Sequence, residues 1–178
     1  MQKISIITIT YNDLVGLKKT WQSIKCQKYK YYEWIVIDGG STDGSKEFII
    51  EHACEMSYWC SEKDKGVYNA QNKGTQHASG EYVIYMNSGD YFYDKHVLEK
   101  VFSAEMTADI IYGDWTQEFA DGEKRRITCE IVRKKPHGSL LWELQPRIFL
   151  PYASTSDRMC HYSTALECLC FLCQLYIV

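Results

Sequence analysis

The stretch Ile4-Ser5-Ile6-Ile7-Thr8-Ile9-Thr10-Tyr11-Asn12 carries the strongest indication of fold in this sequence of 178 residues. Apolar and β-branched side chains run together and end abruptly in polar residues, as in a buried strand that leaves a sheet. Asp13 is placed to cap a helix, in which apolar residues recur at steps of three and four, at Leu14, Leu17, Trp21 and Ile24. A buried strand followed by an amphipathic helix is the unit of a parallel sheet covered by helices.

The same alternation continues along the chain. Further strands are predicted at residues 34–37, 56–60, 82–86 and 109–112. A helix is predicted to follow the loop at 39–45 and to end near Ala53, and two more are predicted at 67–77 and 94–104. Neither a fixed-period repeat nor a low-complexity linker interrupts them. We therefore expect an α/β fold, with a mostly parallel sheet flanked by helices in one domain over residues 1–137.

The composition excludes several classes of protein. With 46% hydrophobic residues the chain can build a core, and its net charge of -3 argues against a broad nucleic-acid-binding surface. Basic runs at 124–126 and 133–135 are most simply solvated surface, with contact to phosphate or anionic lipid as the alternative. The first residues lack a signal-peptide core, and no apolar run reaches membrane-spanning length. We expect a cytoplasmic protein with at most peripheral contact at the inner face of the cell membrane.

The character of the sequence changes after residue 137. Residues 138–178 contain a single aspartate, Asp157, and four of the eight cysteines. The segment is interpreted either as an irregular cap or as a truncated or out-of-frame tail. A zinc site is a weaker alternative, because the cysteines do not form two Cys-x-x-Cys pairs. Those cysteines are Cys160, Cys168, Cys170 and Cys173.

Polar residues follow each of the first four predicted strands. They are Tyr11 and Asn12, then Asp38, then Asp64, and finally Asn87-Ser88-Gly89-Asp90. Because ligands of parallel α/β sheets collect at the carboxyl ends of the strands, we expect these loops to share one site. Taken singly, Asp38 and Asp64 have a simpler interpretation as helix caps or turn residues.

The residue types at this site indicate which ligand it takes. The Gly-rich stretch at 39–46 lacks the Gly-Lys-Ser/Thr ending of a phosphate loop, and no Gly-x-Gly-x-x-Gly follows the first strand. Acids stand there instead, which suits a divalent cation, Mg or Mn, bridging protein and diphosphate. Asp90 is the predicted metal ligand, with Asn87 and Ser88 orienting the loop or binding ribose.

Four motifs in this order resemble family 2 glycosyltransferases of the GT-A fold, and in particular enzymes of bacterial exopolysaccharide assembly such as colanic acid. The motifs lie at residues 4–12, 34–45, 61–74 and 87–90, and the resemblance covers roughly residues 3–137. It implies transfer of a sugar, with inversion, from a nucleoside diphosphate, most simply UDP, to a glycan or lipid-linked acceptor of a surface polysaccharide.

Site residues follow from the same resemblance. Thr10, Tyr11, Asn12, Asp38 and Asp64 are expected to bind the nucleotide together with Asn87 and Ser88, and Asp90 is the remaining acid of a metal-binding Asp-x-Asp element.

The general base is less well defined. Pro136-His137-Gly138 stands where Pro/Ser-His-Gln is expected, and the pattern then stops. Asp157 is the candidate base. The alternative is an incomplete, non-catalytic chain that binds nucleotide without turnover.

Overall fold

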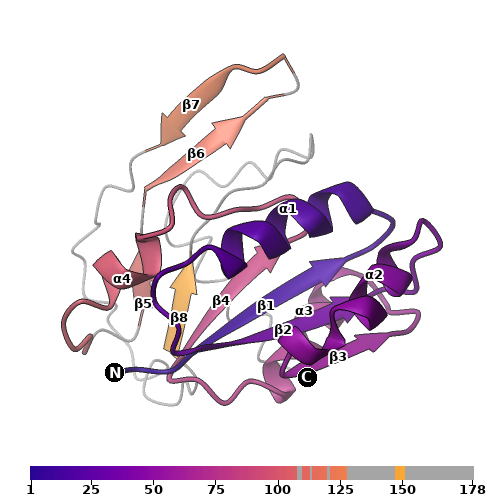
Figure 1. Cartoon of the computed structure of the whole chain (residues 1–178), viewed down its shortest axis with the longest axis horizontal. Helices are drawn as coiled ribbons and strands as arrows, with labels where there is room; N and C mark the ends of the chain where they lie inside the picture. The colour runs from indigo at the N-terminus through magenta and orange to yellow at the C-terminus, as the bar shows by residue number, and fades with distance from the viewer. Residues whose placement is uncertain (108–109, 113, 120, 128–146, 151–178) are drawn as a thin grey trace, which may run out of the picture.

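The computed structural model describes residues 1–107, 110–112, 114–119, 121–127 and 147–150. Within these ranges a six-stranded parallel sheet has the order β3-β2-β1-β4-β8-β5 (Figure 1). Its strands are β1 (Ile4–Thr10), β2 (Tyr32–Asp38), β3 (Tyr58–Ser61), β4 (Tyr82–Asn87), β5 (Ile110–Tyr112) and β8 (Arg147–Leu150). A separate antiparallel hairpin is formed by β6 (Trp115–Glu118) and β7 (Lys124–Ile127). The helices are α1 (Leu14–Lys25), α2 (Ser45–Glu51), α3 (Val67–Gln76) and α4 (Val97–Val101), with a 3-10 turn at Ala53–Glu55.

The expected α/β fold with a parallel sheet is confirmed, with differences at its margins. The helix predicted over 94–104 is shorter, since α4 covers only Val97–Val101. Before it, the Asp94 carboxylate accepts a hydrogen bond from the His96 N–H at 2.6 Å and so holds a turn where the helix was expected to begin. The hairpin and β8 were not predicted. Strand β8 lies beyond the boundary expected at residue 137 and pairs with both β4 and β5. None of the helices in the described ranges is long and apolar enough to cross a bilayer.

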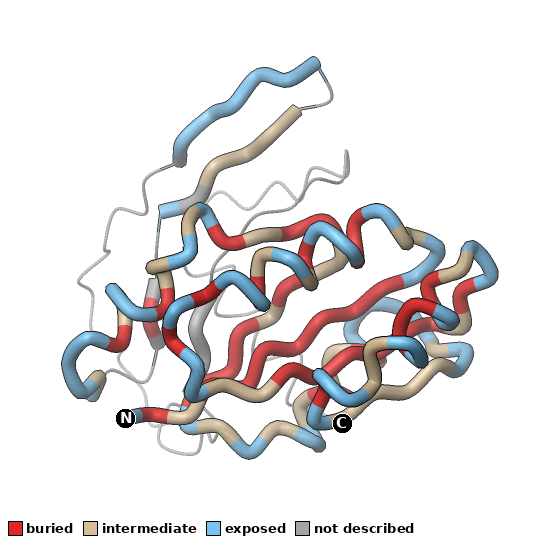
Figure 2. Tube along the Cα trace, viewed as in Figure 1, coloured by how far each residue is buried: buried red, intermediate tan, exposed pale blue. Residues whose placement is uncertain are grey.

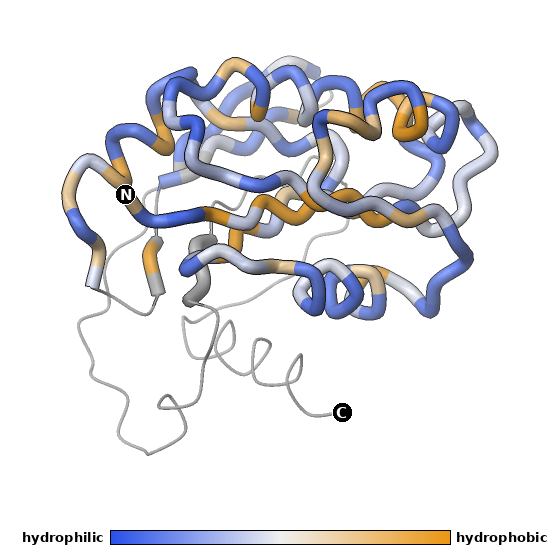
Figure 3. Tube along the Cα trace, turned by 60° about the horizontal axis from the view of Figure 1, so that its bottom comes forward, coloured by the Kyte–Doolittle hydropathy of each residue, from blue (hydrophilic) through white to orange (hydrophobic). Residues whose placement is uncertain are grey.

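Strand β1 is the centre of the core, since all seven of its residues are buried (Figure 2). Its side chains alternate between two faces, as strand geometry requires. Ile4 and Ile6 pack with residues of α1 and α2, whereas Ile7 and Ile9 pack with residues of α3. Hydrophobic residues follow the strands through the middle of the molecule in Figure 3, whereas the helices alternate hydrophilic and hydrophobic stretches.

Helix α3 approaches the sheet closely at Gly74. A Cβ atom on this glycine would lie 2.4 Å from Cγ2 of Ile7, so any larger side chain would push helix and strand apart. The buried Ala70 lies one turn earlier on the same helix. Small residues at this spacing therefore set the distance between α3 and β1.

The strand order reverses at β1, and this reversal positions the site. The chain adds β2 and β3 on one side of β1, and β4 on the other. The register aligns Thr10 with Asp38 and Asp38 with Ser61, and pairs Ile9 with Asn87. The carboxyl ends of four strands thus meet at one edge, at the switch point where open α/β sheets bind ligands.

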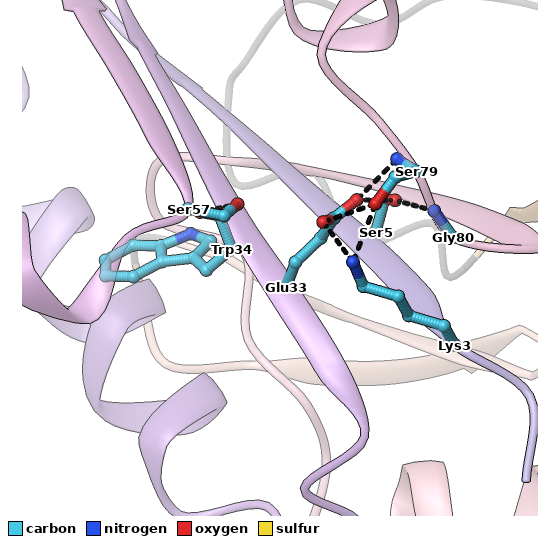
Figure 4. A network of polar contacts seen from close by, with 7 residues as sticks. All are labelled: Lys3, Ser5, Glu33, Trp34, Ser57, Ser79 and Gly80. Atoms are coloured by element: carbon cyan, nitrogen blue, oxygen red, sulfur yellow. Dashed lines mark hydrogen bonds and ion pairs between the residues drawn. The ribbon is translucent and has the colours of Figure 1, made fainter.

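A polar network closes the opposite, amino-terminal edge of the sheet (Figure 4). The Glu33 carboxylate, whose side chain is 8% exposed, pairs with Lys3 Nζ at 2.7 Å. It also accepts hydrogen bonds from the hydroxyl groups of Ser5 and Ser79 and from the Ser79 N–H. Although burial opposes ionisation, these partners lower the pKa of Glu33 to about 2. The network ties β1, β2 and the turn before β4 together.

We expect Glu33→Gln to lower the free energy of unfolding by roughly 1–2 kcal/mol at pH 7, because the folded state favours the ionised carboxylate. The contribution is fully present above the unfolded pKa of about 4.5 and is lost as the pH falls toward 2. Urea unfolding at several pH values measures it. Glu62→Gln is the control, because Glu62 pairs with Lys73 while 62% exposed. A difference between wild type and Glu33→Gln that stays constant from pH 7 to pH 2.5 would contradict this role.

Candidate functional site

Two backbone carbonyl groups at the end of β1 hold the loops on either side of it. The Ile9 carbonyl oxygen accepts a hydrogen bond from the Ser88 N–H at 2.9 Å, and the Thr10 carbonyl oxygen accepts one from the Gly39 N–H at 2.9 Å. The loops that follow β4 and β2 are therefore both fastened to the strand at which the sheet order reverses.

Asp38 organises the loop after β2. Its carboxylate is fully buried and accepts hydrogen bonds from the Ser41 N–H, from the Ser41 hydroxyl and, at 2.6 Å, from the Ser61 hydroxyl. These hydrogen bonds shape the turn at 39–41 and tie it to the end of β3. Contact between Asp38 and a nucleotide base stays a prediction.

Asn12 links the loop after β1 to the loop after β2. Its backbone has a φ of 49°, a left-handed conformation that asparagine adopts more readily than most residues. Its N–H donates to the Ser41 hydroxyl at 2.7 Å, and its side-chain Oδ1 accepts from the Thr42 N–H at 2.8 Å. Thus one exposed residue fixes the relation of the two loops.

Tyr11 and Asp64 converge over Gly39. A Cβ atom on this glycine would lie 2.9 Å from Asp64 Oδ2 and 3.2 Å from Tyr11 Cδ2, so glycine leaves room for both side chains. Tyr11 is 66% exposed, and the other carboxylate oxygen of Asp64 accepts from the Gly66 N–H at 2.8 Å. The structure thus places an exposed aromatic ring and an acid side by side at the end of β1.

The predicted metal ligand closes a tight turn after β4. Gly89 has a φ of 93°, and the Asp90 N–H donates to the Asn87 carbonyl oxygen at 3.0 Å. In return, the Asn87 N–H donates to Asp90 Oδ2 at 3.0 Å. The Asp90 carboxylate is therefore held against its own turn, with only 5% of the residue exposed.

Burial has a large effect on the ionisation of Asp90. It raises the pKa of this carboxyl to about 7, against the smaller opposing effects of the Asn87 N–H and the Lys19 charge. Near neutral pH a cation at this carboxylate would compete with a proton.

Three buried side-chain oxygens at this edge have no hydrogen-bond partner among the described residues: Thr10 Oγ1, Asn87 Oδ1 and Asp90 Oδ1. Since buried polar atoms are normally paired, they are candidates to bind polar groups of a ligand. In the part of the chain that the structure describes, no three His, Cys, Asp or Glu side chains gather into a metal site. Asp90 Oδ1 nevertheless fits Mg or Mn, which often take one carboxylate and complete their shell with phosphate and water oxygens.

Some residues of this site were missed from the sequence, and some predicted ones lie elsewhere. Ser61 holds the loop after β2 through Asp38, and the Thr20 hydroxyl holds the loop after β4 by accepting a hydrogen bond from the Gly89 N–H; neither was predicted to do so. Thr20 had a signal, because it falls on the same side of its helix as Leu17 and Ile24, where a polar side chain indicates a buried partner. Asp157 and the four cysteines of the tail lie outside the described residues.

A surface hollow of about 410 Å³ lies away from this site, at the amino-terminal edge of the sheet. It is lined by Met1, Lys28, Tyr29, Lys30, Tyr31 and Glu99. None of these residues follows the carboxyl end of a strand, and none belongs to the loops just described. The candidate site is therefore the edge formed by the four loops.

The fold resembles GT-A glycosyltransferase structures such as TarS and PcManGT. S. aureus TarS 1-349, solved also with UDP-GlcNAc, superposes with a TM-score of 0.57 at 22% identity, over 68% of this chain and 36–37% of that one. The mannosyltransferase PcManGT of Pyrobaculum calidifontis, in complex with GDP-Man and Mn²⁺, gives 0.53 at 23% identity, over 64% and 34%. At this identity the likeness establishes the fold.

Sequence relatives are glycosyltransferases. An uncharacterised glycosyltransferase of Mycobacterium tuberculosis is 41% identical over 102 residues, which are 57% of this chain and 39% of the relative. Glycosyltransferase GlyA of Streptococcus pneumoniae is 34% identical over 119 residues, 64% of this chain and 17% of that one. The chain thus spans about two fifths or less of these relatives. The model of glycosyl transferase family 2 matches residues 5–163, past the boundary expected at 137, and the chain belongs to that family.

Proposed function

We propose that the carboxyl edge of the sheet binds a nucleoside-diphosphate sugar, most simply a UDP-sugar, and that the chain transfers the sugar to an acceptor hydroxyl. One arrangement carries the proposal: the register puts the ends of β1 and β4, and so Tyr11 and Asp90, at one edge, and Asp64 lies beside Tyr11 over Gly39. Three buried oxygens at this edge have no partner among the described residues. The nucleotide sugars in the structures of TarS and PcManGT support it.

The two halves of the edge suit the two halves of such a donor. Tyr11 offers an exposed ring on which a base can stack, and Asp64 beside it offers acceptor oxygens to base or ribose. Thr10, Asn12 and Asp38 shape that half, with Asp38 as the predicted contact to the base. Asn87, Ser88 and Asp90 form the half that would meet the diphosphate.

Asp90 would hold a divalent cation, Mg or Mn, through its Oδ1 atom. When bound, the cation neutralises charge that develops on the departing nucleoside diphosphate. The Mn²⁺ in the structure of PcManGT supports a divalent cation at this site, and the choice of Asp90 as its ligand comes from the sequence and the free Oδ1 atom. The Asn87 N–H keeps the Asp90 carboxylate oriented through Oδ2, which leaves Oδ1 for the cation.

The acceptor side of the proposal rests on the family resemblance. A glycan or lipid-linked acceptor in surface polysaccharide synthesis is proposed, with reaction at the cytoplasmic face of the membrane and inversion at the anomeric carbon. Asp157 is proposed to take the proton of the acceptor hydroxyl. A second candidate, nucleotide binding without turnover, is favoured by the change in residue usage after residue 137, where half of the cysteines gather.

Asp90→Asn should abolish the Mn²⁺-dependent part of UDP binding, measured by calorimetry with and without Mn²⁺. The same change should raise the free energy of unfolding by roughly 2–4 kcal/mol at pH 8. The pKa of Asp90 is higher in the folded than in the unfolded chain, so ionisation of Asp90 lowers the free energy of unfolding as the pH rises from about 4 to 7. Asparagine carries no charge, so the variant does not lose this stability. Asp121→Asn, in an exposed turn, is the control. Metal-dependent binding that survives in Asp90→Asn would refute the metal assignment.

Tyr11→Ala should weaken UDP binding about 10- to 100-fold, because stacking of a base on an aromatic ring contributes about 1–3 kcal/mol. Stability should change little, since the ring is largely exposed. Tyr31→Ala removes an exposed ring at the other edge of the sheet and should leave binding unchanged. Equal affinities of wild type and Tyr11→Ala would place the base elsewhere.

Turnover is tested separately from binding, by UDP release from UDP-sugars. If Asp157 is the base, Asp157→Asn should lower turnover by roughly 10²- to 10⁴-fold while UDP binding persists. Unchanged turnover in this variant would rule Asp157 out. A wild-type chain that binds UDP with Mn²⁺ but releases none from UDP-sugars would support the second candidate.

A further inference from the structure

Helix α1 presents a row of small and polar residues to the segment that carries Asp90. Gly16, Thr20 and Ser23 in α1, and Gln27 just after it, follow one another at steps of four, three and four residues, so they lie on one side of the helix. We call these four residues the α1 row. Each of them contacts the backbone of residues 87–98.

Thr20 occupies the centre of the α1 row and is fully buried. Its hydroxyl donates to the Asp90 carbonyl oxygen at 2.7 Å, with the Asn87 carbonyl oxygen at 3.3 Å, and accepts from the Gly89 N–H at 3.0 Å. One side chain thus bonds to three of the four residues that form the turn around the predicted metal ligand.

The other members of the α1 row fasten the same segment at further points. A Cβ atom on Gly16 would lie 2.7 Å from the Gly89 nitrogen, so this glycine lets the turn rest directly on the helix. The Ser23 hydroxyl accepts from the Phe92 N–H at 3.4 Å. Gln27 donates to the Asp94 carbonyl oxygen at 2.7 Å and accepts from the Leu98 N–H at 3.2 Å.

These contacts determine where the Asp90 carboxylate lies. Its Oδ2 atom is held by the Asn87 N–H, and the backbone of both Asn87 and Asp90 is held in turn by Thr20. The hydrogen bonds are directional, whereas apolar packing alone would let the turn slide along the helix. Residues that orient a metal ligand in this way commonly change metal affinity about 10- to 100-fold when they are removed.

We propose that Thr20 is a positioning residue for donor binding, and that the α1 row sets the geometry of Asp90 toward the cation and diphosphate. The inference rests on the proposed function of the site. Helix α1 carries none of the predicted ligand-binding residues, yet by this inference it contributes to the affinity for metal and nucleotide. Without the Thr20 hydroxyl, the turn loses its hydrogen bonds to α1, while the bond from the Ser88 N–H to the Ile9 carbonyl oxygen and the core around it remain.

The test compares Thr20→Val, which keeps the shape and removes the hydroxyl, with Thr20→Ser, which keeps the hydroxyl. Thr8→Val is the matched control, because the Thr8 hydroxyl is also fully buried and accepts a hydrogen bond from Trp34 Nε1 at 2.9 Å, within the core. UDP affinity is measured by calorimetry with and without Mn²⁺. Hydrogen exchange of the Gly89 amide, followed by NMR, reports the turn itself without ligand.

We expect Thr20→Val to weaken Mn²⁺-dependent UDP binding roughly 10- to 100-fold and to speed exchange at Gly89. Thr20→Ser should restore the UDP affinity and the slow exchange of the Gly89 amide. Thr8→Val should lower the melting temperature but leave the UDP affinity and the Gly89 exchange rate at wild-type values. Wild-type affinity in Thr20→Val, equal loss in Thr8→Val, or no recovery in Thr20→Ser would each overturn the proposal.

Gly16→Ala provides a second variant in case Thr20→Val does not fold. The added Cβ would lie 2.0 Å from Oδ2 of the capping Asp13, whose side chain can turn away, and 2.7 Å from the Gly89 backbone nitrogen, so the turn must shift. We therefore expect weaker Mn²⁺-dependent binding, together with a lower melting temperature from the disturbed cap. Unchanged affinity in this variant would count against the α1 row. If wild type itself binds no UDP with Mn²⁺, the proposed function fails, whereas fast Gly89 exchange in Thr20→Val would still support the anchoring of the turn.

Discussion

Strand β1 is confined from four directions at once: parallel neighbours hydrogen-bond to both of its edges, and helices cover both of its faces. The backbone at the carboxyl end of β1 therefore has little room to move. The carbonyl groups of Ile9 and Thr10 can then act as fixed acceptors for the loops after β4 and β2. The geometry of the candidate site is thus a direct extension of the core, and loops that would be mobile on an open edge are held in place.

Much of this arrangement could be predicted from the sequence, for a physical reason. Strands such as β1 and β2, which are buried on both faces, show up in the sequence as continuous apolar runs. Helix α1 shows up through apolar residues that recur every three or four positions. The convergence of Tyr11, Asp38, Asp64 and Asp90 follows from parallel pairing alone. Contacts such as those of Asp38 with Ser41 and Ser61 depend on side-chain orientation and register. The short strand β8 has too few residues to show a period, so its place between β4 and β5 could not be predicted.

At Asp90, a property that would serve ligand binding lowers the stability of the fold. Asp90 is nearly fully buried, and its desolvation makes the ionised form unfavourable in the protein alone. The opposite holds for Glu33 at the other edge of the sheet, where lysine, hydroxyl and amide partners favour the charged form. Both acids are largely hidden from water, but only one has its charge fully compensated by the chain. The difference separates an acid that serves the fold from one proposed to serve a ligand.

The position of β8 has a consequence for the order in which the chain assembles. Within the described residues, β5 joins the sheet through β8 alone, yet β8 begins 35 residues after β5 ends, at Arg147 against Tyr112. During synthesis β1 to β4 can pair as soon as they emerge, whereas β5 must wait with an unpaired edge until β8 is made. Closing this long-range contact is a slow step by its topology, and the waiting strand is open to wrong partners meanwhile.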